Sequence, residues 1–160
     1  MTLEILKKDL NYNKKTGVFT WRTAPANRII VGQLAGTLRK DGYRVICVKS
    51  KYYLAHRLAW FWIHMEWPHG DIDHINRVRS DNRIANLRDV SRSINMQNIK
   101  NHQKNNISGF LGATTMPHKR WHARIMVNGK QIFIGSFKSP LEAHNAYIKK
   151  KQEKHRGYVK

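Results

Sequence analysis

The sequence predicts an α+β fold divided into two small domains. Hydrophobic residues make up 41% of the 160 residues, which allows two small buried cores. Apolar residues recur at helical spacing over residues 54–65, whereas apolar and polar residues alternate as in a strand over residues 120–127. The polar segment 101–107 shows neither pattern, so we expect a linker there. The predicted domains are therefore residues 1–100 and residues 108–160.

A short helix and a β-rich extension are expected at the start of the first domain. The helix is predicted around residues 3–10, and residues 17–21 alternate like a strand. The turn-forming residues 40–43, Lys-Asp-Gly-Tyr, predict a hairpin that joins residues 33–39 to residues 44–49. This extension leads into the longest helix predicted in the domain.

The middle of the chain, residues 54–98, combines that helix with a loop and a second helix. Pro68 marks the end of the first helix, and residues 71–76 are expected to be extended and rich in turns. A polar loop follows. Ser91 is placed to cap a short helix over residues 92–98.

The second domain is predicted as a three-stranded antiparallel sheet packed on one helix. The strands are expected at residues 109–115, 120–127 and 131–137. Asn128-Gly129 is a strong hairpin turn between the last two strands. Ser139 is placed as a helix cap, and the helix is expected to reach about residue 154.

Alternation along residues 120–127 predicts a strand with two different faces. One face is apolar and can pack on the helix: Trp121, Ala123, Ile125 and Val127. The other face is open and largely basic: Arg120, His122, Arg124 and Met126. Gln131 and Phe133 on the next strand are expected to join the open face, where arginine can contact guanine or phosphate. Otherwise the positive charge serves only to keep the sheet from aggregating.

Positive charge dominates the composition. Thirty lysines and arginines oppose ten acidic residues, which gives a net charge of +20. A charge of this size attracts polyanions and predicts salt-sensitive binding to nucleic acid. A ribosomal or chromatin-like protein, or a protein of the membrane surface, would carry a similar charge.

The composition excludes several classes of protein. The sequence has no run of about twenty apolar residues, which a membrane-spanning helix requires. The first four residues lack the basic and apolar regions of a secretion signal. The single cysteine, Cys47, excludes an internal disulfide and a zinc site built from cysteines. We therefore expect a protein of the reducing cytoplasm.

Half of the acidic residues lie in residues 51–100, which hold five of the ten carboxylates. Carboxylates at a surface that binds DNA indicate a metal ion. Asp73 and His74 are adjacent there, and they would point to opposite sides of an extended chain. Histidine is suited to proton transfer near neutral pH. Asp73 and Asn95 offer oxygen atoms of the kind that magnesium prefers.

These residues and their order resemble the HNH nuclease family, in the subgroup whose last histidine is replaced by asparagine. The resemblance covers about residues 10–100 and rests on Asp73-His74, Asn86-Leu87-Arg88 and Ile94-Asn95. The preceding residues 55–60, Ala-His-Arg-Leu-Ala-Trp, are similar to a helix of phage and intron-encoded members. The resemblance implies a ββα-metal core, also called a His-Me finger, in which a hairpin and a helix clasp one divalent ion.

The resemblance also implies roles for individual residues. His74 would be the general base, and Asn86 would pin the loop that orients it. Asp73 and Asn95 would hold one Mg²⁺ or Mn²⁺ ion, and the products would carry 5′ phosphate and 3′ hydroxyl groups. Basic residues near this site are expected to neutralise phosphates, although they could equally form a solvated face: Arg57, Arg77, Arg83, Arg88 and Arg92.

Two residues near the motif fall outside this pattern. Arg77 stands where relatives often have glycine, and a left-handed turn there would strain arginine by about 1 kcal/mol or more. His56 either contacts phosphate or packs as a polar group at the start of its helix. It is therefore not included among the catalytic residues.

The second domain resembles the Apetala/ethylene-response-factor DNA-binding domain over about residues 106–158. The similarity rests on residues 108–112, 119–125, 134–137 and 142–147. It implies a sheet that enters the major groove of DNA, with contacts from Lys119, Arg120, His122, Arg124 and Gln131. Plant members carry arginines along the first strand, where this chain has Leu111, Thr114 and Met116. Recognition of the plant target sequence therefore does not follow.

Together these observations predict a metal-dependent HNH endonuclease that hydrolyses phosphodiester bonds in double-stranded DNA, by nicking or by double-strand cleavage. We expect a homing-type, phage-encoded enzyme in the cytoplasm of a bacterial host. It would act as a monomer or weak dimer, with no obligate protein partner and no membrane. The alternative is a non-catalytic, sequence-specific DNA-binding protein built on a degenerate nuclease. An RNA-binding structural protein would explain the charge, but not the carboxylates beside a histidine.

Overall fold

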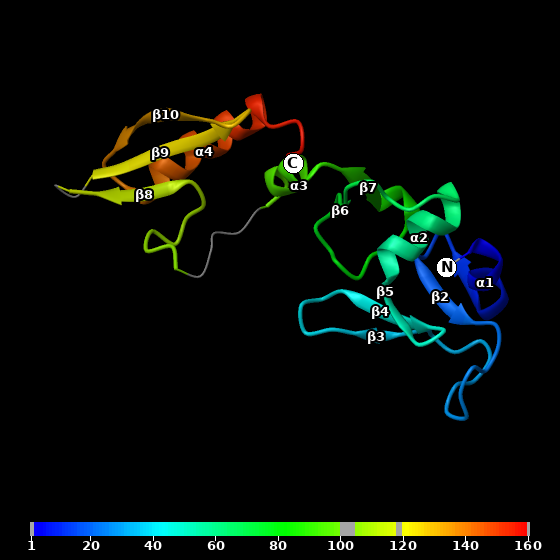
Figure 1. Cartoon of the computed structure of the whole chain (residues 1–160). Helices are drawn as coiled ribbons and strands as arrows, with labels where there is room; N and C mark the ends of the chain where they lie inside the picture. Colours follow the sequence, from blue (N-terminus) through cyan, green and yellow to red (C-terminus); the bar gives the residue numbers. More distant parts are fainter. Residues whose placement is uncertain (1, 100–104, 118–119, 160) are drawn as a thin grey trace. The chain divides into compact units, whose positions relative to one another are not determined.

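The computed structural model describes residues 2–99, 105–117 and 120–159 (Figure 1). Within these residues the chain forms four α-helices and several small antiparallel sheets, so the predicted mixture of helix and sheet is confirmed. Contacts divide the chain into two compact units, Met1–Asn95 and Met96–Lys160. The division falls a few residues before the predicted linker at 101–107, of which residues 101–104 lie outside the described part.

None of the helices in the described ranges is long and apolar enough to cross a membrane.

The first unit begins with α1 (Leu3–Asp9) and a two-stranded hairpin. The Thr2 hydroxyl caps α1 by accepting from the backbone N–H of Ile5. The hairpin pairs β1 (Leu10–Asn13) with β2 (Val18–Trp21). The sequence predicted β2 but not β1, because β1 has only four residues and two of them are asparagine. Gly17 has φ +73° in the turn between the two strands.

A three-stranded sheet follows, in the order β3 (Thr37–Leu38), β4 (Arg44–Val48) and β5 (Lys51–Leu54). The predicted turn at residues 40–43 does join β3 to β4. However, β3 is much shorter than the expected strand 33–39, and β5 was not expected at all. Only Lys49 and Ser50 separate β4 from β5, and both have positive φ. Glycine and asparagine are the usual residues in such a turn, so the sequence contains no clear signal for it.

The core of the first unit lies against α2 (Ala55–His64). Leu58 and Ala59 are fully buried, and Ile72 and Leu87 belong to the same core cluster. Met65 ends the helix in the left-handed conformation, with φ 63°. The helix therefore supports the hairpin on which Ile72 and Leu87 lie.

That hairpin consists of β6 (Asp71–His74) and β7 (Leu87–Val90). The strands pair antiparallel, with Asp73 opposite Arg88 and His74 opposite Leu87. The loop between them ends in a single 3-10 turn, η1 (Ile84–Asn86), and β7 is followed by α3 (Arg92–Gln97). A hairpin followed at once by a helix thus carries the residues singled out in the sequence (Figure 1).

Arg77 lies in the tight turn that follows β6, with φ 66°. Its backbone N–H donates to the His74 carbonyl at 2.9 Å, so the turn is closed by a hydrogen bond. The left-handed conformation strains any residue with a Cβ atom by about 1 kcal/mol. Arg77→Gly should therefore raise the free energy of unfolding by about 1 kcal/mol relative to Arg77→Ala, as measured in urea. The alanine variant also lacks the guanidinium, so equal stabilities would show that the turn is not strained.

The second unit contains a three-stranded antiparallel sheet and one long helix, as the sequence predicts. The strands are β8 (Ala113–Met116), β9 (Arg120–Val127) and β10 (Lys130–Phe137), in the order β10-β9-β8. Helix α4 (Pro140–Lys154) contacts all three strands. Ser139 caps it by accepting from the N–H of Glu142. Ala123 and Ile125 are buried while Arg124 and Met126 are exposed, which confirms the two faces of β9.

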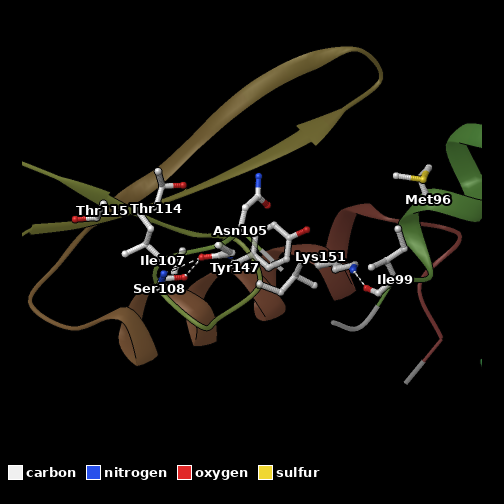
Figure 2. A pocket seen from close by; sticks show the side chains of 12 residues that line it. Met96, Ile99, Asn105, Ile107, Ser108, Thr114, Thr115, Tyr147 and Lys151 are labelled. Atoms are coloured by element: carbon white, nitrogen blue, oxygen red, sulfur yellow. Dashed lines mark hydrogen bonds between the residues drawn. The ribbon is translucent and has the colours of Figure 1, made fainter. Parts of the chain in front are cut away.

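Lys151 is buried in the second unit, although its lysine neighbours suggest a solvated helix face. Its side chain is 1% exposed, because it follows Ala143 and Tyr147 at four-residue intervals on the inner side of α4. The ammonium donates to the Ile99 carbonyl at 2.6 Å, drawn as a dashed line in Figure 2. The rings of Tyr147 and Tyr158 lie 5.7 and 5.1 Å from Nζ. A hollow lined by residues that include Ile99, Tyr147 and Lys151 is seen in Figure 2. Its volume is about 490 Å³.

Candidate active site on the β6–β7 hairpin

His74 is the last residue of β6 and is held by a buried asparagine. Its Nε2 lies 3.2 Å from Oδ1 of Asn82, a residue that is itself only 2% exposed. The Asn82 amide nitrogen donates to the Ser80 carbonyl, so its oxygen is the atom that faces histidine. An oxygen acceptor requires hydrogen on Nε2 of His74. The lone pair of the neutral imidazole then lies on Nδ1.

Aromatic rings pack around His74. The ring of His56 lies 5.1 Å from it and that of Tyr43 lies 5.9 Å from it, measured between centroids. Burial lowers the pKa of His74, while the Asn82 hydrogen bond and the charges of Asp73 and Asp81 act in the opposite direction. The imidazole is therefore neutral near pH 7, which is the state that a general base requires.

His56 is a buried partner of this cluster and does not reach the surface. It is 5% exposed, and its ring meets that of Tyr43 edge to face. Burial, with the nearby His74 and Arg57, lowers the pKa of His56 to about 3. Of the two roles that the sequence leaves open, packing at the start of α2 fits this position.

The depressed pKa of His56 predicts acid-sensitive stability. Between about pH 6.5 and pH 3 the unfolded chain binds a proton at this residue and the folded chain does not. Stability is therefore complete above pH 6.5 and falls as pH falls, by up to about 1.4 kcal/mol per pH unit. His56→Gln should flatten this slope by about one proton, measured by urea unfolding at pH 7, 6, 5 and 4. If the slope of the unfolding free energy against pH does not change, another residue takes up the proton.

Asp73 lies on the other side of β6 from His74, as the alternation of a strand requires. It is buried and forms an ion pair with Arg88 on β7, whose Nη2 and Nε lie 2.6 and 2.8 Å from Oδ2. Asp71 shares this side of the strand. Asn95 of α3 reaches it and donates to Asp71 Oδ2 at 3.1 Å. From the sequence we expected Asn95 to approach Asp73. The hydrogen bond of Asn95 is instead made to Asp71, two residues earlier.

The donor groups on this side of the hairpin fit a hard divalent cation. Asp73 and Asp71 supply carboxylate oxygens, and Asn95 supplies an amide oxygen, which are the groups that Mg²⁺ and Mn²⁺ accept. Among the described residues no three histidine, cysteine, aspartate or glutamate side chains gather into a metal site. A cation held by Asp73 and Asn95 would thus leave most of its coordination positions to water and phosphate. Arg88 must share Asp73 with such an ion.

Asn86 joins the two ends of the loop between β6 and β7. Its Oδ1 accepts from the backbone N–H of Asn76 at 2.9 Å, and its Nδ2 donates to the Asp81 carbonyl at 2.8 Å. These bonds close the loop that carries Asn82. Asn86 therefore acts on His74 through the loop, whereas Asn82 contacts the imidazole directly.

Three of the arginines that were expected to contact phosphate have partners within the protein. Arg57 donates to the carbonyls of Pro68 and Gly70, Arg83 pairs with Asp81, and Arg88 pairs with Asp73. Arg57 thereby ties α2 to the segment before β6. Arg92 is exposed on α3, and Arg77 occupies the turn described above.

The open face of the second unit brings together most of its predicted DNA contacts. On β9, His122 pairs with Thr114 of β8 and with Ser136 of β10, and Arg124 pairs with Phe133. Arg120 and Gln131 lie on the same face, at opposite ends. Phe133 is 55% exposed beside Arg124. Lys119 lies outside the described residues. The sequence placed these residues by alternation alone, and the strand register agrees.

Sequence reasoning missed three contributors to the site. Asn82, Asp71 and Tyr12 have no role in the prediction from the sequence. The Tyr12 hydroxyl donates to the Asn82 carbonyl at 2.7 Å, across 70 positions of sequence. Asp71 stands two residues before Asp73, which is a signal for a shared strand face. Spacing contains no comparable signal for Tyr12.

Comparison with known proteins agrees with the position of this site. A family model described as HNH endonuclease matches residues 53–97. No curated protein and no solved structure gives a significant match to the chain. The matched segment contains both strands of the hairpin, α2 and α3, with His74, Asn86 and Asn95. Residues 53–97 are thus similar to an HNH endonuclease domain, and this match supports a nuclease that acts on DNA.

Proposed function

We propose that this protein is a divalent-metal-dependent HNH endonuclease that hydrolyses phosphodiester bonds in double-stranded DNA. One observation carries the proposal. A neutral histidine, held in one tautomer by Asn82, ends the strand whose other side carries Asp73, within the segment that matches the HNH family. Phosphodiester hydrolysis requires a general base and oxygen ligands for a metal ion, and this short hairpin carries both kinds of group.

Each residue has a separate task in this reaction. His74 takes a proton from water through Nδ1, and Asn82 keeps the hydrogen on Nε2. Asn86 closes the loop that holds Asn82 in place. Asp73 and Asn95 would hold one Mg²⁺ or Mn²⁺ ion, as in a ββα-metal core. When bound, the ion stabilises the charge that develops on the phosphate and on the leaving 3′ oxygen.

The second unit serves as the DNA-binding domain in this proposal. Its sheet is similar in sequence pattern to the Apetala/ethylene-response-factor domain, and its open face gathers arginine, histidine, glutamine and an exposed phenylalanine. Such a face can contact phosphates and base edges in the major groove. The lysines and arginines elsewhere add affinity that does not depend on DNA sequence.

The wider setting follows from the same resemblance. We propose a homing-type enzyme encoded by a phage and acting in the cytoplasm of a bacterial host. One active site in each chain predicts a nick by the monomer. Cutting both strands would need a second encounter or a weak dimer.

Nicking of supercoiled plasmid tests the proposal directly. Plasmid that contains the DNA flanking the gene should be converted to the open circular form with Mg²⁺ or Mn²⁺, and EDTA should stop the conversion. DNA binding should persist in EDTA. Plasmid that stays supercoiled with either metal, despite measurable binding, would contradict the enzyme.

A second function, a DNA-binding protein without catalysis, is favoured by one observation. Arg88 forms an ion pair with Asp73, the residue that would hold the metal. In such a protein this ion pair would be permanent, and binding without nicking would be the result of the same assay.

A further inference from the structure

We infer that a basic hollow beside the loop of the active site binds a phosphate of the DNA strand next to the cleaved bond. This inference rests on the proposed function. The hollow measures about 580 Å³. Lys14 and Lys15 of the β1–β2 turn form one wall, and Asn76 with residues 83–86 of the loop forms the other. The first wall lies outside the segment that matches the HNH family.

The charge of this hollow is positive and is not neutralised by the protein. In the described part of the chain, neither Lys14 nor Lys15 has a carboxylate within ion-pair distance. Asp81 is the acid nearest in sequence to the loop wall, and it is engaged by the guanidinium of Arg83 and the amide of Asn76. These bonds lower the pKa of Asp81 to about 2. The two ammonium groups thus remain available to an anion.

The turn that carries the lysines is held in one conformation. Asn13 Oδ1 accepts from the backbone N–H groups of Lys15 and Thr16 at 3.0 and 3.3 Å. The Asn13 carbonyl accepts from the N–H of Gly17 at 2.8 Å. A turn ordered in this way loses little conformational entropy when it binds a ligand. Only the side chains of the lysines need to be ordered.

The same turn is attached to the loop that holds His74. A Cβ atom on Gly17 would collide with the backbone of Asn82 and Arg83, so these backbones are in close contact. Tyr12, at the base of the turn, donates to the Asn82 carbonyl at 2.7 Å. Burial raises the pKa of Tyr12 to about 12, so the hydroxyl remains a donor. Because the Asn82 side chain holds the imidazole, the lysines keep a constant position relative to the base.

The chemistry of the hollow selects a phosphodiester of the substrate strand. Two lysines and several amide groups suit a phosphate, and none of the lining side chains is acidic. Asn76 and Asn86, which line the hollow, belong to the loop that follows His74. We therefore expect a strand whose scissile phosphate lies at His74 to bring a neighbouring phosphate to this wall. Contacts to the flanking phosphate would orient the strand for attack.

A double substitution with a matched control tests this inference. Lys14→Ala/Lys15→Ala removes the two charges of the hollow, and Lys40→Ala/Lys51→Ala removes two exposed charges from the hairpins of the other sheet. Binding of a fluorescent duplex is measured from 50 to 300 mM NaCl, and plasmid nicking is measured with enzyme in excess. Melting temperatures show whether the variants remain folded.

Lys14→Ala/Lys15→Ala should lower the magnitude of the slope of log affinity against log salt by about 1, because one phosphate contact contributes about 0.9. Its nicking rate should fall about ten-fold or more, and Lys14→Arg/Lys15→Arg should restore both values. An unchanged slope and rate would overturn the inference, and so would equal losses in the control variant. Inorganic phosphate at constant ionic strength should not compete with the duplex if the site recognises a strand rather than a free anion. If the wild-type protein binds DNA but does not nick it, the proposed function is wrong. The salt slope still tests whether the hollow binds a phosphate.

Discussion

His74→Ala is expected to reduce plasmid nicking by a factor of about 10³, while DNA affinity changes less than two-fold. The loss follows from the role of the imidazole, because general base catalysis contributes a factor of about 10² to 10⁴. Affinity should persist because His74 is neutral and only 4% exposed, so its loss removes no charged contact to DNA. Rates are measured from the appearance of open circles under single-turnover conditions.

His69→Ala is the matched control, since His69 is an exposed histidine near the same hairpin. It should nick like the wild type. Because His74 is buried, the melting temperature of the alanine variant must be checked, and Asn82→Ala offers a second route to the same step. It should lower the rate without removing the base. Binding that falls in parallel with nicking would assign His74 to DNA contact instead.

Asp73→Asn should lower nicking by at least about 10²-fold and leave or improve DNA binding. In the proposed site the substitution would remove the charge that holds the cation, so added Mg²⁺ or Mn²⁺ should not restore the rate. It also removes one negative charge near the phosphates, which favours binding. Loss of the charged partner of Arg88 should cost about 1.5 to 3 kcal/mol of stability, measured in urea.

Asp41→Asn is the charge-matched control, because Asp41 forms an exposed ion pair with Arg39. Its nicking rate and its unfolding free energy should stay close to those of the wild type. If Asp73→Asn nicks at the wild-type rate, the ion pair with Arg88 is the only task of Asp73. The DNA-binding protein without catalysis would then be the better interpretation.

The elements that the sequence predicts well are those with a strong local signal. Apolar spacing predicted α2, and alternation with Asn128-Gly129 predicted β9 and β10 within one residue. The missed strands β1 and β5 have four residues each and owe their form to partners elsewhere in the chain. Local propensity contains little information about such short strands.

The residues of the site also divide into those with a local signal in the sequence and those without one. The order of Asp73, His74, Asn86 and Asn95 identified the hairpin, because these residues lie within one continuous segment. The bond from Tyr12 to the loop and the position of the lysines depend on the packing of a distant hairpin. Spacing along the chain does not encode such contacts. Arg77 is an intermediate case, since its turn was anticipated and its left-handed φ is observed.

The burial of Lys151 has a consequence for truncation. Its ammonium binds the Ile99 carbonyl, and Gly157 near the end of the chain donates to the Gln97 side chain. A fragment that starts at residue 108 would lose both acceptors, whereas one that starts at residue 96 would retain them. The second unit should therefore be expressed with the last residues of α3 attached.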